Sequence, residues 1–538
     1  MKNKRMISVI GAIIGLVAIF SLFYVFAKKP KVVPHEIVYN LGADPATIDT
    51  CLANATDAAN VITATFEGLT RIQPDQKPGP GVAKNWDLSS DGKVYTFHLR
   101  DDAKWSDGKA VTANDFYFAW TRLLNPATAA DYSFQLFYVK NAENYFNKKA
   151  KLSDLGLKVV DQKTFEVTLN APVPYFLELC AWAQLAPERA EIVNANPKAW
   201  ANNVDTYIGN GPFKLTSWKH GDSMEFVKNE NYWDKANVKI DKMKWTMIVE
   251  ASSALMAWEK GDVDIIETIP TANIPIMIKN KKLTVTPYLG SYCLYINTKK
   301  APFDNVKFRK ALNLAIDRSV ITNTILKAGQ IPAGAWVPKG LLEPSGKDFR
   351  DYKPEYFKVT GDVAEAKKLL LESGVDTTKL EVEYLYNTSE AHKKIAEAIQ
   401  NMWSTNLGIK VKLSNQEWSV FQTTRKAGNY MIARAGWIGD YSDPMTFLDM
   451  FTSESGQNDI KYTNKAYDTL ISQAKNSADP EARMVAMHKA EDMLINDMPL
   501  IPIYFYVNTI AINPRIKGFY KTITGPLYFD KAYIQEVK

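Results

Sequence analysis

The sequence is poor in the residue types that carry most metal and redox chemistry. Its 538 residues include only three cysteines and five histidines. The cysteines, Cys51, Cys180 and Cys293, form no C-x-x-C pair, so they predict neither a zinc site nor a dithiol redox centre. The chain also lacks the H-E-x-x-H, G-x-x-x-x-G-K and G-x-S-x-G motifs of zinc, phosphate and acyl-enzyme chemistry. We therefore expect a protein that is not an enzyme and that holds no metal or cofactor.

One nucleophile motif, S-x-x-K, occurs twice, at Ser90–Lys93 and Ser106–Lys109. Both copies read Ser-Asp-Gly-Lys, and the internal glycine and aspartate are typical of tight turns. A turn is therefore the preferred interpretation of both copies. Catalytic residues scattered along a chain leave no local motif, so a hydrolase remains an alternative.

The balance of charge argues against a nucleic-acid partner. The chain has 65 lysines and arginines and 59 acidic residues, a net charge of +6. Six of the basic residues precede Glu36, the first acidic residue, which leaves 59 basic and 59 acidic residues in the rest. A nucleic-acid-binding surface needs a basic excess on one face. We expect no nucleic-acid partner.

The N-terminus begins with a long apolar run, Met6–Ala27, which contains no charged residue. A secretory hydrophobic region needs about 7–15 residues and a membrane-spanning helix about 20. Residues 1–27 are therefore predicted to be either a signal peptide or an N-terminal membrane anchor, and residues 28–35 a linker. Basic residues flank both sides of the run, so charge does not decide its orientation.

Hydrophobic periodicity predicts a mixed α/β protein of two to four domains. Alternating apolar residues mark strands, and apolar residues three and four apart mark helices. The clearest predicted elements are a hairpin over 86–100, helices over 57–69, 115–125, 305–321, 362–374, 392–408 and 482–494, and strands over 36–41, 164–169, 289–298 and 499–512.

The stretch 409–451 carries the most informative pattern. A predicted strand over 409–413 is followed by a short helix over 417–424 and a second apolar strand over 430–437. The second strand ends in Gly-Asp-Tyr-Ser-Asp-Pro, a run dense in turn formers. The stretch thus places tryptophans, arginines and an aspartate at strand ends, where binding residues often lie.

Motifs in this stretch resemble the ligand-binding segment of the extracytoplasmic oligopeptide-binding proteins of ABC peptide importers, solute-binding protein family 5. They are NQEW (415–418), ARAGW (433–437) and DYSDP (440–444). The run YTFHLRDDAKWSDGKAVTANDFYFAW (95–120) resembles an N-terminal part of the same family. These motifs lie far apart and in the order of the family.

The resemblance implies a two-lobed fold of the periplasmic-binding-protein type, with an extra inserted domain, that closes over its ligand like a clam. It implies a monomeric receptor outside the membrane that captures short peptides and delivers them to the permease subunits of an ABC importer. Alternatives are the same fold with a sugar, a nickel complex or a signalling peptide as ligand, and, from another class, a hydrolase or a holdase. The implied domains are a first lobe of residues 36–70, 190–290 and 508–538, an inserted domain of residues 71–189, and a second lobe of residues 291–507.

A peptide receptor must compensate the two terminal charges of its ligand. The α-ammonium needs a carboxylate, and the α-carboxylate needs a cation. By resemblance, the aspartate pairs with the ammonium, the arginines and the histidine meet the carboxylate end or line the cleft, the tryptophans form pocket walls, and the tyrosine and the lysine contact the ligand and its tail. The ligand-binding residues implied in this way are Asp440, Trp437, Arg434, Arg425, Trp418, His392, Tyr132 and Lys327.

Two positions depart from the family pattern. The acidic residue of the first helix falls at Ala58, with Asp57 one place away, which weakens an acidic ligand contact there. Cys293 has Ile438 where some members have its disulfide partner, so Cys293 is expected to be a free, buried thiol. Cys51 and Cys180 are then expected either to form a disulfide or to stay unpaired, as the sequence leaves both open.

Overall fold

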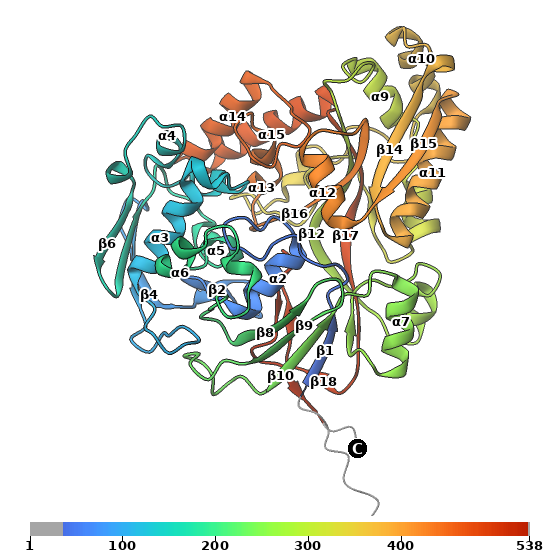
Figure 1. Ribbon diagram of the computed structural model, residues 1–538. Helices are drawn as coiled ribbons and strands as arrows, with labels where there is room; N and C mark the ends of the chain where they lie inside the picture. Colours follow the sequence, from blue (N-terminus) through green and yellow to red (C-terminus); the bar gives the residue numbers. More distant parts are fainter. Residues whose placement is uncertain (1–35, 536–538) are drawn as a thin grey trace, which may run out of the picture.

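The computed structural model describes residues 36–535, which form two lobes and an inserted domain (Figure 1). The predicted signal peptide or membrane anchor (1–27) and the linker (28–35) lie outside the described residues. Within residues 36–535, no helix is both long and apolar enough to cross a membrane. The predicted mixed α/β fold is confirmed by the topology of its sheets.

A mixed sheet of eleven strands runs through both lobes in the order β15-β14-β16-β12-β17-β11-β1-β10-β9-β8, with β13 paired to β17 beside this path. The first lobe, built on β1 and β8 to β11, lies at the bottom of Figure 1, and β14 and β15 of the second lobe lie at the upper right. The strands are β1 Glu36–Asn40, β8 Phe213–Lys219, β9 Ser223–Lys228, β10 Lys242–Thr246, β11 Ile265–Ile266, β12 Thr284–Ile296, β13 Ile331–Pro332, β14 Glu381–Asn387, β15 Lys410–Gln416, β16 Ile432–Ile438 and β17 Leu500–Ile512.

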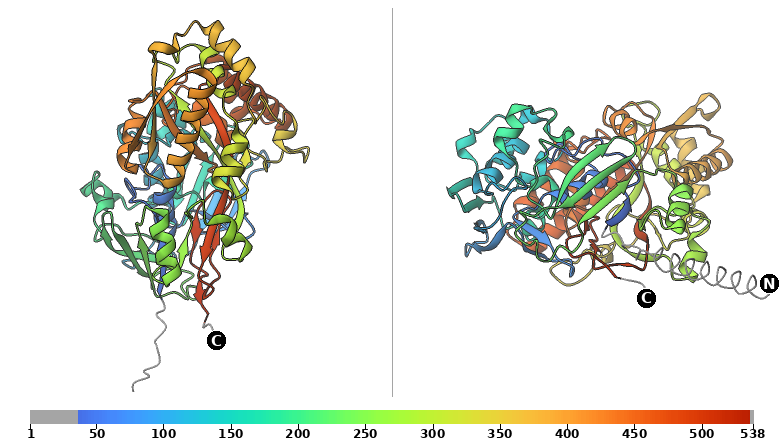
Figure 2. Two further views of the ribbon diagram at one scale, coloured as in Figure 1. Left: turned by 90° about the vertical axis from the view of Figure 1, so that its right-hand side faces the viewer. Right: turned by 60° about the horizontal axis from the view of Figure 1, so that its bottom comes forward.

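The long antiparallel strands β12 and β17 connect the two lobes, and Figure 2 shows the red strand β17 running from one into the other. Their register shifts between Pro287 and Ser291. Residues 284–287 of β12 are exposed, whereas every residue from Leu289 onward is buried. The shift therefore falls where β12 leaves the surface of the first lobe and enters the core of the second. Strand β12 begins at Thr284, five residues before the predicted start at 289. The prediction missed these residues because they are exposed and include a proline, so they lack the apolar pattern of a strand.

The inserted domain contains a separate four-stranded sheet in the order β4-β5-β7-β6. Helix α3 (Ala113–Leu124) begins two residues before its predicted start at 115, and the backbone N–H of Thr112 donates to Asp115 Oδ2 at 2.7 Å. The side chain of Trp120 is fully buried, and its Nε1 donates to the carbonyl of Leu185 at 3.0 Å.

The remaining strands of the whole structure are β2 Thr70–Ile72, β3 Pro78–Pro80, β4 Ala83–Leu88, β5 Val94–Leu99, β6 Leu157–Asp161, β7 Thr164–Thr168, β18 Ile516–Lys517, β19 Tyr520–Lys521, β20 Leu527–Tyr528 and β21 Tyr533–Ile534.

Most helices occur where periodicity predicts them, with local differences at their ends. The helix predicted over 305–321 is shorter than expected, since α9 ends at Leu314 and a separate π-helix spans Val320–Leu326. Helix α9 is capped by Asn305, whose Oδ1 accepts from the backbone N–H groups of Lys307 and Phe308 at 2.9 and 3.3 Å. The remaining α-helices are α2 Thr56–Thr65, α4 Ala142–Phe146, α5 Phe176–Leu179, α6 Ala190–Ala195, α7 Ala251–Lys260, α8 Ile274–Lys279, α9 Val306–Leu314, α10 Val363–Ser373, α11 Glu390–Leu407, α12 Trp418–Lys426, α13 Met445–Leu448, α14 Lys465–Asn476 and α15 Pro480–Asp497.

Helix α2 ends four residues before the predicted position because another segment packs across its C-terminus. A Cβ atom at Gly209 would lie 1.9 Å from the carbonyl oxygen of Thr65, so only glycine allows this approach. Beside it, the Asn210 side chain accepts from the backbone N–H of Glu67 at 3.0 Å and donates to its carbonyl at 2.9 Å. The G-N-G segment thereby fixes the helix whose other end reaches the cleft between the lobes.

The three cysteines are unpaired and buried. Cys293 is therefore a free, buried thiol, as predicted. The alternative of a disulfide between Cys51 and Cys180 is wrong: Cys51 Sγ points to the carbonyl of Ala119 at 3.6 Å, and Cys180 lies beside β2, where its carbonyl accepts from the N–H of Thr70 at 3.4 Å. Burial raises the pKa of both thiols well above its usual value.

Candidate ligand-binding cavity

A cavity of about 190 Å³ lies between the lobes. Its walls come from helix α2 and the loop before it, from the inserted domain, and from α12, β16 and β17 of the second lobe. Helices α2 and α12 approach each other near the centre of Figure 1. Six of the eight predicted ligand-binding residues line this cavity: Tyr132, Trp418, Arg425, Arg434, Trp437 and Asp440.

One wall of the cavity is a strand edge. Strand β16 pairs with β12 along its whole length, from Ile432 to Ile438. On its other edge it pairs with β14 only at Ile432 and Ala433. Within the described residues, positions 434–438 therefore have no strand partner on that edge, and residues of this segment line the cavity. An unpaired edge of this kind can bind an extended chain through backbone hydrogen bonds, without reading its side chains.

Asp440 lies just beyond the end of this edge. Its Oδ2 accepts from Gln135 Nε2 at 2.9 Å, and its backbone N–H donates to Thr446 Oγ1 at 2.9 Å. Among the ion pairs within residues 36–535, none includes Asp440. Burial, together with the nearby carboxylate of Asp449, raises the pKa of Asp440 well above its usual range. A cationic ligand group would supply the missing counter-charge.

Arg434, which lies on β16 itself, carries the opposite charge to the Asp440 carboxylate. Its Nη2 donates to the Tyr506 hydroxyl at 3.0 Å, and its guanidinium carbon lies 5.1 Å from the centre of the Tyr292 ring. Its Nε is buried and has no acceptor among residues 36–535. No carboxylate in that part of the chain forms an ion pair with it. The cavity therefore contains one carboxyl group and one guanidinium group that have no partner of opposite charge among residues 36–535, at Asp440 and Arg434.

Arg425 lines the cavity but is already neutralised. Its Nε donates to Asp459 Oδ2 at 2.8 Å, and Asp459 also lines the cavity. The coulombic attraction of Asp459 and neighbouring groups raises the pKa of Arg425 although burial alone would lower it. Compared with Arg434, this arginine has less unbalanced charge to offer a ligand carboxylate.

Aromatic side chains close the cavity from both sides. The rings of Tyr132, in the inserted domain, and Trp437, on β16, have centroids 6.1 Å apart. Trp182 packs against Tyr132 with a centroid distance of 4.4 Å and a near-perpendicular ring plane. These rings give the cavity apolar walls between its charged positions, as is usual in small-ligand sites.

Trp418 makes a contact across the cleft that the sequence did not predict. Its Nε1 donates to Asp57 Oδ2 at 3.0 Å and so joins α12 to α2. Burial raises the pKa of Asp57 from 3.8 to about 6. The family pattern has an acidic residue at position 58, where this chain has alanine. The carboxyl group of the neighbouring Asp57 instead accepts a hydrogen bond from the opposite lobe.

Replacing Asp57 by asparagine should change how stability depends on pH. The pKa of Asp57 is higher in the folded protein, at about 6, than in the unfolded chain. Its contribution to stability is therefore complete below the pKa of the unfolded chain, and it is lost as the pH rises through about 6. Asparagine removes the buried charge and can accept from Trp418 through its amide oxygen, but it loses the second acceptor, which takes the backbone N–H of Ala58 at 2.7 Å. Asp57→Asn should therefore increase the free energy of unfolding at pH 7 by roughly 1–2 kcal/mol, the gain from the removed charge less one hydrogen bond. Urea denaturation between pH 4 and pH 8 measures this, with Asp75→Asn, in an exposed turn, as control. Identical pH profiles for Asp57→Asn and the wild type would contradict the assignment.

His392 and Lys327 are not among the cavity-lining residues. The Nδ1 atom of His392 lies 3.4 Å from the hydroxyl of Tyr292, whose ring packs against Arg434. Burial and the charge of Arg434 lower the pKa of His392 well below its usual value, so it is neutral at pH 7. Lys327 is exposed in a left-handed conformation, with φ of 61°, after the π-helix Val320–Leu326. Their roles toward a ligand stay predictions.

Several cavity residues were missed in the sequence. They are polar or aromatic residues outside the recognised motifs, and their roles depend on partners distant in the chain. Gln135, which holds Asp440, is 305 positions away from it, so no local spacing could reveal the pair. The missed cavity-lining residues of this kind include Asn54, Tyr295, Gln422, Gln457, Asp459 and Tyr506. Asp57 and Gln135 do not line the cavity but hold Trp418 and Asp440 from behind it.

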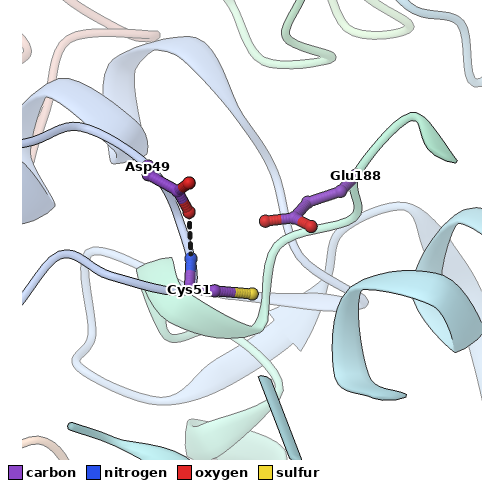
Figure 3. A group of neighbouring side chains, drawn as sticks. All are labelled: Asp49, Cys51 and Glu188. Carbon is purple, nitrogen blue, oxygen red and sulfur yellow. Dashed lines mark hydrogen bonds between the residues drawn. The ribbon is translucent and has the colours of Figure 1, made fainter. Parts of the chain in front are cut away.

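A second cluster has the composition of a metal site. Ligand atoms of Asp49, Cys51 and Glu188 lie within 4.8 Å of one another (Figure 3). However, Arg122 donates to both oxygens of Asp49 at 2.7 and 2.8 Å and to Glu188 at 2.6 Å. A metal ion would bring a second cation next to this guanidinium, so the residues do not fit a metal. Instead, the buried ion pairs tie the loop before α2 to the inserted domain.

The fold and the enclosed cavity define a two-lobed solute-binding protein. The chain belongs to the bacterial extracellular solute-binding proteins of family 5, whose middle-region family model matches residues 77–459. It is similar to the oligopeptide-binding protein OppA of Bacillus subtilis (strain 168), with 40% identity over 509 residues and 92% of each chain covered. The family resemblance found in the sequence is therefore confirmed.

Two solved structures of relatives, one with a peptide and one without, allow a comparison. The structure is similar to Haemophilus influenzae OppA in complex with the peptide RPPGFSPFR, with a TM-score of 0.86, 37% identity, and 93% and 99% of the two chains covered. Against the murein tripeptide-binding protein MppA in its unliganded open form, the TM-score is 0.61 at 34% identity, with 94% and 98% covered. Identity and coverage are nearly equal in the two comparisons, and the structure is more similar to the peptide complex than to the unliganded open form.

Proposed function

We propose that this protein captures short peptides outside the cytoplasmic membrane and delivers them to the permease subunits of an ABC importer. The observation that carries the proposal is the buried carboxylate of Asp440, which lies at the end of an open strand edge without a cationic partner in residues 36–535. A peptide supplies the two groups that this arrangement lacks, an α-ammonium and an extended backbone. The similarity to oligopeptide-binding proteins supports the same ligand class.

In this proposal the ligand's amino end pairs with Asp440, and its backbone follows residues 434–438 of β16. Arg434 attracts the α-carboxylate of a ligand short enough to end beside it. Arg425 has a smaller role because Asp459 compensates it. Backbone pairing and the two terminal charges give affinity without selecting side chains, so we infer a broad sequence tolerance.

Isothermal titration with an unmodified tripeptide and the same peptide acetylated at its amino end tests the proposal. The unmodified peptide should bind, and acetylation should remove most of the affinity because it removes the charge that compensates Asp440. Native mass spectrometry of freshly purified protein identifies co-purified ligand directly. Binding of neither peptide, with a sugar or a nickel complex retained instead, would overturn the proposal.

The other expected properties belong to the same proposal. We infer no catalytic activity, which a turnover assay with bound peptide would test. We also infer a monomer, attached to the membrane or exported through residues 6–27. The lobe boundaries given by the family resemblance, at residues 70, 189, 290 and 507, stay a prediction. Limited proteolysis with and without ligand would locate the flexible connections.

Ligand binding should close the two lobes about β12 and β17. Contacts such as Asp57–Trp418 and Gln135–Asp440 join different lobes or domains, and the closed state needs them. Peptide should therefore lower the radius of gyration in solution scattering and raise the melting temperature by mass action. A scattering curve unchanged at saturating peptide, while calorimetry reports binding, would contradict hinge closure.

A further inference from the structure

An exposed surface that is both apolar and basic lies on the first lobe, apart from the ligand-binding cavity. It is formed by α8 and the start of β12, and none of its residues lines the cavity. Between residues 275 and 287, the side chains of Met277 and Leu283 are buried and all the others are exposed. The two buried side chains pack in the small apolar core that α7 also helps to form. They fix the segment on the lobe, and the rest of it faces solvent.

Three of the exposed side chains in this segment are large and aliphatic. Ile276 is 49% exposed, Ile278 40% and Val285 36%. Single exposed aliphatic residues are common on soluble proteins and need no explanation. Here three of them occur within one short segment that is held on the lobe by only two buried side chains. Removing these aliphatic groups from water would be favourable.

The same segment carries positive charge without a counter-charge. Its three exposed lysines are Lys279, Lys281 and Lys282. The chain has no acidic residue from Thr268 to Phe303. The two acidic residues that come before this stretch, Asp264 and Glu267, already pair with Arg515 and Lys521. None of the three lysines forms an ion pair within residues 36–535, so they remain free to meet an anionic surface.

This surface lies at the end of the sheet from which the chain continues toward its N-terminus. Strands β1 and β12 run in the same direction, so the segments before Glu36 and before Thr284 leave the sheet at the same end. The strand pairs that establish this are Tyr39–Ile265, Ile265–Ile512 and Ile510–Thr284. Three strand spacings and about five residues along the strand separate Thr284 from Glu36, which corresponds to roughly 20 Å.

The short linker before Glu36 restricts which part of the protein can face a membrane that holds residues 6–27. Residues 28–35 are eight in number, and three of them are lysines. Eight residues span at most about 29 Å when fully extended. Glu36 then stays within that distance of the bilayer, and the α8 segment is near enough to Glu36 to reach the bilayer surface.

We propose that α8 and the start of β12 contact the surface of an anionic lipid bilayer. Ile276, Ile278 and Val285 lie among the headgroups, and the three lysines meet the lipid phosphates. This combination of aliphatic and basic side chains suits the interface of an anionic membrane. The inference rests on the proposed attachment through residues 6–27 and not on the identity of the ligand. The contact fixes the first lobe at the membrane and leaves the second lobe free to move about β12 and β17.

A fluorescent label at Ile278→Cys tests the contact. The three native cysteines are buried, so an exposed thiol is labelled selectively. The full chain is reconstituted in phosphatidylcholine vesicles with or without about 30% phosphatidylglycerol, and a nitrobenzoxadiazole label is reduced by dithionite from the aqueous side. Leu371→Cys on α10, 83% exposed, is the control position. On anionic vesicles we expect reduction at position 278 to be about fivefold slower than at 371, and this difference to disappear without phosphatidylglycerol or at high salt.

A charge variant shows whether the lysines make the contact. Lys279→Gln/Lys281→Gln/Lys282→Gln should remove the protection of the label at position 278. A matched control removes three exposed lysines of the inserted domain and should retain the protection; its substitutions are Lys148→Gln, Lys149→Gln and Lys151→Gln. Equal loss of protection in both triple variants would show a general effect of net charge and would overturn the assignment to α8.

Two further outcomes would overturn the membrane contact. One is equally fast reduction of the labels at positions 278 and 371 on anionic vesicles. The other is protection that appears only after permease subunits are added, which would assign the surface to the permease. Calorimetry of the same preparations with trialanine separates this inference from the proposed function. The triple variant of α8 should bind trialanine within twofold of the wild type, and a wild type that binds no peptide would overturn the proposed function alone.

Discussion

Asp440→Asn should weaken the binding of an unmodified tripeptide by about 10²–10³-fold. Leaving one charge of a buried ion pair without its partner costs roughly 3–5 kcal/mol, and in the variant the ligand's ammonium is that charge. Asparagine can still accept from Gln135, so the local geometry is retained. Stability should not fall, because burial already raises the pKa of the Asp440 carboxyl in the ligand-free form. Isothermal titration and thermal unfolding of the same preparations measure both quantities.

Glu178→Gln provides the matched control for this prediction. Glu178 accepts from the backbone N–H of Ser442 at 2.7 Å, in the same turn as Asp440, but it does not line the cavity. Its substitution should leave peptide affinity within a few fold. An amino-acetylated peptide should bind the wild type as weakly as the unmodified peptide binds Asp440→Asn. Equal affinities of Asp440→Asn and the wild type for the unmodified peptide would remove Asp440 from the site.

Asp443→Asn should reduce the free energy of unfolding by about 3–5 kcal/mol. Asp443 is 6% exposed and accepts from both terminal nitrogens of Arg483, at 2.6 and 2.7 Å. It also accepts from the backbone N–H of Met445 at 2.9 Å. Its replacement leaves the guanidinium buried without a carboxylate. Urea denaturation measures the loss, and the ligand affinity of the remaining folded protein should change little.

The double variant Asp443→Asn/Arg483→Met separates charge from packing. Removing the orphaned guanidinium should recover a large part of the lost stability, because replacing both partners of a buried pair costs much less than removing one. If the double variant is as unstable as the sum of both single variants, the ion pair is not the cause. Two aspartates of one motif are thus expected to differ completely, Asp440 acting in binding and Asp443 in folding.

The local elements of this protein could be predicted from its sequence. The turn formers of DYSDP end β16 within one residue of the predicted position, and α3 begins at Ala113, two residues before its predicted start. The glycines after α10 and α11 adopt the left-handed conformation that ends a helix. These features depend on residues a few positions apart, so a linear pattern contains the necessary information.

The sequence predicted most of the residues of the candidate site, but not which of them form ion pairs or hydrogen bonds with one another. The family motifs placed six of the eight expected residues on one cavity. They did not reveal that Arg425 is paired with Asp459 while Arg434 is not, or that Trp418 bonds to Asp57. They also left the cysteine pairing open, and the structure separates the three thiols into different surroundings.

The sequence by itself determined the composition of this protein, its helices and strands, and the motif residues brought to the cleft. Only the tertiary structure decided which charges remain uncompensated there, because the partners that neutralise or hold them come from distant segments. Asp459 is 34 positions from Arg425, Arg483 is 40 from Asp443, and Gln135 is 305 from Asp440. Whether a buried charge is available to a ligand depends on every group within a few ångströms, and that set is assembled only when the lobes pack together.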